Sequence, residues 1–303
     1  MVPSKLNLKQ EKRNWLDLPS DVTFNILNRI GMVDILENAQ KVCTAWRKIC
    51  KDPAMWRVIN MNDIPRFGTR LFPIEMCKHA VDRSQDQLVD ITASADVSAV
   101  KMCKHAVDRS QGQLVDITIV FLYDDDLHLY VADRSSQLRR LEMAHQFFFG
   151  CVKLTTVALM KFPLLEELNL YEIRISKEEI ETVGRYCPML KTLKANKRGY
   201  EGSLMRYNEI AIAIGQNLLG LRHLELIGNR MTNVGLHVIL DNCHHLETLD
   251  LRRCFCIDLK GDLGKQCSEQ IKYLKLPHDP LEDYPYIHVT ESEYYNTLIL
   301  LLR

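Results

Sequence analysis

The sequence predicts an α/β protein in which a small helical module, residues 15–60, precedes a long solenoid of short strands and helices. Three observations predict this fold class. The segment L-x-x-L-x-L recurs along most of the chain, the stretches between its copies show helical periodicity, and residues 15–60 do not follow the repeat. Residues 1–14 are polar and charged, and we expect them to form a flexible N-terminus.

The amino-acid composition limits the classes of partner that we expect this protein to bind. Of the 303 residues 47 % are hydrophobic and 26 % are charged, which is typical of a globular protein. Lysine plus arginine equals aspartate plus glutamate at 39 each, and this balance argues against nucleic-acid binding. No apolar run approaches the ~20 residues that cross a bilayer. The polar start does not resemble a secretory signal, so we expect a reducing compartment, the nucleus or the cytoplasm.

The leucine repeat predicts eight strands. Alternating leucines place one row of side chains inward along each short strand. Successive copies are separated by 24 to 31 residues, a period typical of solenoid repeats. The copies begin at Leu88, Leu114, Leu138, Leu165, Leu190, Leu221, Leu246 and Ile271.

The stretches between the strands are expected to be helices. Ser176 followed by Glu179 has the spacing of a capping box. Ile180 and Val183 then fall on one helical face, as do the apolar residues of 231–243.

Cysteines recur just before the strands. Cys187 and Cys243 each precede the next strand motif by three residues, and Cys267 precedes it by four. We expect them to fill the narrow space where helix meets strand, as buried free thiols. The ten cysteines contain no pair of C-x-x-C knuckles, so no metal site is expected.

Over residues 76–276 this pattern resembles the cysteine-containing class of leucine-rich repeats. The resemblance implies a curved solenoid of about eight repeats, with short parallel strands on the concave face and helices on the convex face. Residues 61–75 are then a linker or cap. Residues 277–303 leave the pattern and contain three prolines, so a C-terminal cap or tail is expected.

Two of the repeats are nearly identical in sequence. Residues 76–92 return at 102–118, and only Asp86 and Gly112 differ. The offset of 26 residues is one repeat period, so an added unit fits the stack as one more strand and helix.

The N-terminal module resembles an F-box. Pro19 lies near a helix start, where its missing N–H costs nothing. The residues that carry the resemblance are Leu18, Pro19, Ile26, Leu27, Ile30, Val42, Cys43, Trp46, Arg47, Met55 and Trp56. Together with the solenoid, the module is similar to plant F-box/leucine-rich-repeat proteins, and a three-helix F-box is implied.

A module of this size buries too little apolar surface to be stable in isolation. Its remaining apolar residues are therefore expected to contact a partner. The resemblance implies a Skp-type adaptor, and through it a cullin and a RING subunit. The candidate adaptor-binding residues are Leu18, Pro19, Ile26, Leu27, Val42 and Trp46. Trp46 and Trp56 remain open between interface and internal core, and a capping bundle for the solenoid is the alternative for the whole module.

We find no enzyme motif in the sequence, so no catalytic residue and no cofactor are expected. The resemblance implies the substrate receptor of an SCF-type ubiquitin ligase, which holds an unknown target protein near the conjugating enzyme for ubiquitination and proteasomal degradation. The alternatives are a leucine-rich-repeat scaffold outside any ligase, or a small-molecule co-receptor of the hormone-receptor F-box type.

Substrate-binding residues are predicted from strand geometry. Side chains on a strand alternate between core and exposed face, so positions between and just after the leucines are the candidates. They are Glu167, Asn169, Lys191, Lys194, Arg222, His223, Glu225, Arg252 and Arg253.

Overall fold

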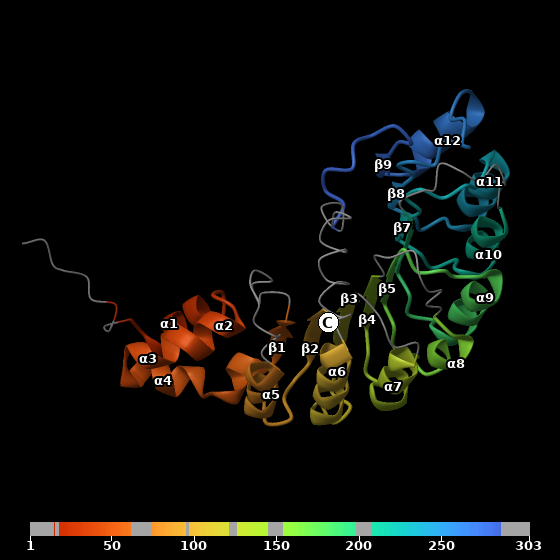
Figure 1. The fold of residues 1–303 in the computed structure, drawn as a ribbon. Coiled ribbons are helices and arrows are strands. Elements are labelled where there is room, and N and C mark those ends of the chain that lie inside the picture. Colours follow the sequence, from red (N-terminus) through yellow and green to blue (C-terminus); the bar gives the residue numbers. More distant parts are fainter. Residues whose placement is uncertain are drawn as a thin grey trace, which may run out of the picture.

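The structure is a computed structural model. It describes residues 15, 18–61, 74–94, 97–120, 126–144, 154–197 and 208–285. These residues form a helical N-terminal module followed by an arc, with a sheet on the inner side of the arc and helices on the outer side (Figure 1). The fold class predicted from the sequence is confirmed. The expected flexible N-terminus 1–14, the inner part of the linker 61–75 and the tail beyond residue 285 lie outside the described residues.

The N-terminal module contains three helical runs and a final turn. They are α1 (Ser20–Leu27); α2 (Met32–Asp34), continued by a π-helical turn (Ile35–Ala39) and α3 (Gln40–Val42); α4 (Thr44–Cys50); and a 3-10 turn (Pro53–Trp56). Pro19 precedes α1 at its N-cap, and the Cys43 sulfur accepts from the Trp46 backbone N–H at 3.4 Å to cap α4. The three-helix module therefore follows from local signals.

Among the described residues, nine parallel strands form one sheet in sequence order. They are β1 (Val58–Asn60), β2 (Asp90–Ser94), β3 (Asp116–Val120), β4 (Arg140–Ala144), β5 (Glu167–Tyr171), β6 (Thr192–Asn196), β7 (His223–Glu225), β8 (Thr248–Asp250) and β9 (Tyr273–Lys275). Strand β1 was not predicted, because it contains no copy of the leucine motif. It pairs with β2 with Ile59 opposite Ile91, so the N-terminal module is hydrogen-bonded to the solenoid.

Strands β2 to β9 each begin two residues after the first residue of a predicted motif. The fourth residue of each motif then points into the core of the solenoid. Fully burying such an aliphatic side chain stabilises the fold by roughly 1.5–3 kcal/mol. From β2 to β8 these residues are 0 % exposed, namely Ile91, Ile117, Leu141, Leu168, Leu193, Leu224 and Leu249.

The outer helices follow the strands in turn. They are α5 (Ile74–Arg83), α6 (Val97–Arg109), α7 (Leu127–Arg134), α8 (Thr156–Leu159), α9 (Lys177–Tyr186), α10 (Glu209–Asn217), α11 (Asn233–Asn242) and α12 (Asp262–Gln270). The predicted capping box is present at α9, where the Ser176 backbone N–H donates to Glu179 Oε2 at 2.6 Å. Gly215 lets α10 approach α11 closely, because a Cβ there would lie 2.5 Å from the Val238 carbonyl oxygen.

The recurring cysteines are buried as predicted. Cys187 and Cys243 follow the last residues of α9 and α11, and Cys267 lies within α12. The Cys187 thiol donates to the Leu159 carbonyl and the Cys243 thiol to the Leu218 carbonyl, each at 3.6 Å. Burial raises the pKa of Cys187 to about 12 and that of Cys243 to about 11. These sulfurs therefore remain neutral thiols that pack the repeat.

Both copies of the duplicated unit form a helix followed by a strand of the stack. Cys77 and Cys103, which are equivalent, are both 0 % exposed. The one position that differs has a left-handed backbone in each copy, with φ of 67° at Asp86 and 80° at Gly112. The extra repeat is therefore accommodated without a break in the sheet.

Candidate adaptor-binding and substrate-binding surfaces

The predicted adaptor-binding residues divide by burial. Pro19 is exposed and the Val42 side chain is 60 % exposed. Leu18 and Ile26 are half-buried, as is Trp46, which packs against the core. All five therefore present some surface, and their role as contacts remains a prediction.

Leu27 is buried, contrary to its predicted role as an adaptor contact. It is 1 % exposed and lies in the core of the module with Thr23, on the face of α1 that packs against α4. Trp56 is also 1 % exposed, and its indole N–H donates to the Cys50 carbonyl at 3.0 Å. Neither residue is available to a partner in this structure, because both fill the inside of the module.

Two exposed apolar residues near these positions were not predicted as contacts. Val22 is 38 % exposed and Ile30 is 40 % exposed. Val22 and Ile26 are four residues apart on α1 and therefore share a face. We call Pro19, Val22, Ile26, Ile30 and Val42 the F-box surface.

Arg83 of α5 joins the N-terminal module to the solenoid. Its guanidinium donates to Gln40 Oε1 at 3.0 Å and to the Cys50 carbonyl at 3.3 Å, and lies 5.5 Å from the ring centroid of Trp56. Together with the pairing of β1 with β2, these contacts fix how the F-box meets the first repeat.

The concave face of β3 to β5 has a net negative charge. Arg140 donates to Asp116 at 2.7 Å, pairs with Glu142, and lies 3.4 Å from Glu167. One guanidinium therefore faces three carboxylates. Asn169 donates to Glu142 at 3.1 Å and to Glu167 at 2.7 Å.

Asn169 is also buried, contrary to its predicted role in substrate binding. It is 1 % exposed, so it supports the two carboxylates and is not a surface residue that reads a target. Glu167 is half-buried on the same face. Its role in substrate binding remains a prediction.

Asp90 extends this charge to β2. It lies directly opposite Asp116 in the sheet. Burial, and then the charge of Asp116, raise the pKa of the Asp90 carboxyl to about 6, although Arg140 opposes the shift. Like charges directly opposite each other destabilise a strand pair.

The remaining predicted side chains on β6 and β7 are paired across the strands. Lys194 lies 3.0 Å from Glu225, and a ring nitrogen of His223, Nδ1, lies 2.9 Å from the Thr248 hydroxyl. The structure therefore brings Lys194 and Glu225 together on the concave face, with His223 exposed beside them.

Lys191 and Arg222 each lie at the end of the sheet where their strand begins. Both are exposed, and Lys191 pairs with Glu166 at 2.9 Å, as Arg222 does with Glu247 at 2.6 Å. Their role as readers of a target remains a prediction.

Arg252 is buried in this structure, and its role in substrate binding remains a prediction. It lies beyond the end of β8, is 4 % exposed, and donates to both oxygens of Asp250. Arg253 is exposed and has a φ of 60°. Only Arg253 of this pair faces solvent, so alternation along the strand does not extend past its last residue.

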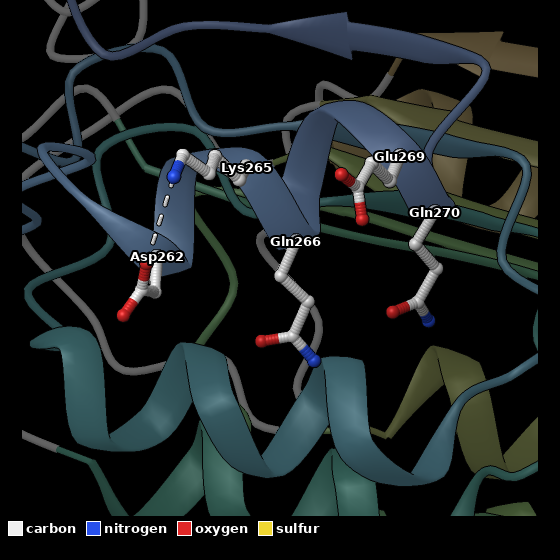
Figure 2. A pocket seen from close by; sticks show the side chains of 5 residues that line it. All are labelled: Asp262, Lys265, Gln266, Glu269 and Gln270. Atoms are coloured by element: carbon white, nitrogen blue, oxygen red, sulfur yellow. Dashed lines mark ion pairs between the residues drawn. The ribbon is translucent and has the colours of Figure 1, made fainter.

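Figure 2 shows a depression lined by α12 beside α11. Gln266 donates to Asp241 at 3.0 Å and Gln270 to the Leu240 carbonyl at 2.9 Å, so this polar seam holds two helices together. Among the described residues, no three His, Cys, Asp or Glu side chains are grouped to hold a metal ion. In the same part of the chain, no helix combines the length and apolar character that a bilayer crossing requires.

Comparisons with known proteins agree with this architecture. Residues 15–62 match the F-box-like family model. Over 278 residues the chain is 42 % identical to the F-box protein SKIP19 of Arabidopsis thaliana, covering 90 % of this chain and 80 % of that protein. It is also 42 % identical to F-box/LRR-repeat protein 23 of the same plant, covering 90 % of this chain and 55 % of the relative.

A chain in the crystal structure of the yeast Rad7 and Elc1 complex superposes with a TM-score of 0.48 at 10 % identity, covering 84 % of this chain and 81 % of that chain. The identity to the Arabidopsis proteins extends through both the F-box and the repeats. The chain therefore belongs to the plant F-box/leucine-rich-repeat family.

Proposed function

We propose that the protein is the substrate-recognition subunit of an SCF-type ubiquitin ligase. It binds a Skp-type adaptor through the F-box surface and a target protein through the repeats. The adaptor connects it to a cullin and a RING subunit, and the target is ubiquitinated and degraded by the proteasome. The chain itself supplies no catalytic group in this proposal.

The observation that carries the proposal is the apolar F-box surface. The module buries Leu27 and Trp56 in its own core but leaves Val22, Ile30 and Val42 at 38 %, 40 % and 60 % exposed. Exposed apolar side chains on a module this small favour a partner that covers them.

The connection between the N-terminal module and the solenoid supports the same role as a substrate receptor. Strand β1 and Arg83 connect the F-box to the first repeat through backbone pairing and side-chain hydrogen bonds. A receptor that holds its adaptor end and its concave face in a defined relation keeps the target near the transfer site. The ligase gains its rate from this proximity.

The charge of the concave face speaks against the small-molecule alternative. Asp116, Glu142 and Glu167 surround the single guanidinium of Arg140 on β3 to β5. An inositol phosphate placed there would meet charges of its own sign. Thermal shift with inositol hexakisphosphate is expected to show no stabilisation.

Adaptor binding tests the proposal. Val42→Asp places a carboxylate on the F-box surface, and Val157→Asp is the matched control, because Val157 is 53 % exposed on α8 of the solenoid. Loss of an interface anchor costs about 2–4 kcal/mol, so we expect Val42→Asp to weaken binding of a recombinant Skp-type adaptor at least ~30-fold. Equal binding by both variants in isothermal titration calorimetry would contradict the proposed surface.

A further inference from the structure

The described part of the C-terminal segment folds back onto the solenoid. After β9 the chain turns over the inner side of the arc (Figure 1). Residues 280–285 have the sequence Pro-Leu-Glu-Asp-Tyr-Pro and contain no strand or helix. We call them the return segment, and two of their side chains anchor it.

The first anchor is ionic. Asp283 pairs with both Arg252 and Lys275, and Arg252 also donates to the Pro280 carbonyl at 2.8 Å. These contacts, from Arg252 first and then Lys275, lower the pKa of the Asp283 carboxyl to about 2. Asp283 therefore remains ionised at any physiological pH.

The charges beneath this anchor favour an anion. Asp250 is 2 % exposed, bonds to Arg252, and lies 3.7 Å from Lys275. Two cations thus share one carboxylate of the repeats, which leaves one positive charge in excess at the end of β8 and β9. Asp283 of the return segment neutralises that charge.

The second anchor is aromatic. Tyr284 is 5 % exposed and meets Tyr171 edge to face, with ring centroids 5.8 Å apart and an angle of 77° between the rings. Val120 and Ala144 complete the patch with Ile227. An aromatic pair of this kind stabilises by roughly 0.5–1.5 kcal/mol beyond burial.

The apolar patch is made by the sheet itself. Val120, Ala144 and Tyr171 occupy the same register position on β3, β4 and β5. They share a face with Asp116, Arg140 and Glu167, because side chains two and four residues apart on a strand point the same way. The patch therefore lies on the concave face.

We propose that these two anchors form a peptide-binding site that accepts an acidic residue followed directly by an aromatic one, and that the return segment occupies it in cis. The inference rests on the proposed function, since it names the class of target segment. A target peptide carrying Asp or Glu before Tyr or Phe uses the cationic pocket of Arg252 and Lys275 and the patch around Tyr171. It competes with the tethered segment.

The cis segment sets the expected magnitude. A tethered ligand acts at an effective concentration in the millimolar range. The wild-type chain is therefore expected to bind a free peptide poorly, and opening the segment is expected to strengthen binding at least ~10-fold.

The test uses the full chain and a fluorescently labelled peptide of residues 279–285, measured by fluorescence anisotropy. We compare wild type with Asp283→Ala/Tyr284→Ala, and with Asp283→Ala alone, whose substituted side chain is 56 % exposed and whose fold is therefore expected to be kept. Tighter binding to either opened variant supports the site. Equal binding to wild type and both variants, or no binding to any, overturns it.

A lysine pair supplies the matched control. In the opened background, Lys275→Ala removes a partner of Asp283, whereas Lys272→Ala removes an exposed lysine that lies over Tyr273. We expect Lys275→Ala to reduce peptide affinity severalfold and Lys272→Ala to leave it unchanged. Equal losses for these two substitutions would contradict the pocket. Adaptor titration of the same variants is independent, so a failed peptide site and a failed adaptor role are distinguished.

Discussion

The duplicated repeat provides a sharp test of the joint between F-box and solenoid. Arg83 and Arg109 occupy the same position in the two copies but contact different surfaces. Arg83 binds Gln40, the Cys50 carbonyl and the face of Trp56. Replacing Arg83 with alanine therefore measures how much the joint contributes to stability. Replacing Arg109 with alanine is the internal control, because its repeat is nearly identical in sequence.

The contacts of Arg83 set the expected loss. Hydrogen bonds from a charged donor contribute about 1.5–3 kcal/mol, and an arginine over an aromatic face adds roughly 0.5–2 kcal/mol. The 3.3 Å bond to Cys50 is long and the side chain is half-buried, so we take the lower part of this range. Arg83→Ala is expected to cost about 2–3 kcal/mol.

The control is expected to cost much less. Arg109 pairs with Asp86 at 3.1 Å and lies 3.8 Å from Asp82, and its side chain is 36 % exposed. Exposed ion pairs contribute roughly 0–1 kcal/mol because water screens them. Arg109→Ala should therefore reduce the free energy of unfolding by about 0.5 kcal/mol.

Urea unfolding measures both losses. The three tryptophans, Trp15, Trp46 and Trp56, all lie in the N-terminal part of the chain, so their fluorescence reports unfolding of the F-box. Far-UV circular dichroism reports the repeats. A lower fluorescence midpoint for Arg83→Ala than for Arg109→Ala is expected, and equal midpoints would refute the role of Arg83 at the joint.

Two further substitutions test the packing and the charge of the repeats. Gly215→Ala is expected to cost about 1–3 kcal/mol, because its Cβ would lie 2.5 Å from the Val238 carbonyl oxygen; an unchanged melting temperature would contradict this. Asp90→Asn is expected to raise stability at pH 7.5 by about 1 kcal/mol after solvent screening. The pKa of Asp90 is raised from 3.8 to about 6, so the wild type loses stability as pH rises between these values and the gain should vanish near pH 4. Urea midpoints that differ equally at both pH values would exclude this cause.

The strands of the solenoid were predictable because their signal is local. One leucine row points inward along each short strand, and the spacing of the rows sets the repeat. Each of β2 to β9 begins two residues after the first residue of its motif. The buried cysteines were predictable for the same reason, since Cys187 and Cys243 precede their strands by a constant number of residues.

Strand β1 and the burial of Leu27 depend on contacts between elements. Val58–Asn60 becomes a strand by pairing with β2, and no periodicity within three residues announces this. Leu27 and Ile26 are neighbours on α1, and only packing against α4 decides that Leu27 is the buried one. A motif shared by both residues does not separate them.

The substrate-binding prediction was limited by long-range polar contacts. Strand alternation places Asn169 on the concave face, but its two bonds to Glu142 and Glu167 bury it. Arg252 is buried by Asp250 within its own repeat and bonded by the return segment. The return segment has no repeat pattern, so its anchors at Arg252 and Tyr171 emerge only in the folded chain.

Hydrogen–deuterium exchange of the full chain, with and without a recombinant Skp-type adaptor, shows whether the N-terminal module is the surface that the adaptor covers. We expect slower exchange in α1, α3 and α4 when the adaptor is present, and unchanged exchange in α9 to α12. Unchanged exchange throughout the F-box, or protection confined to the repeats, would contradict this expectation.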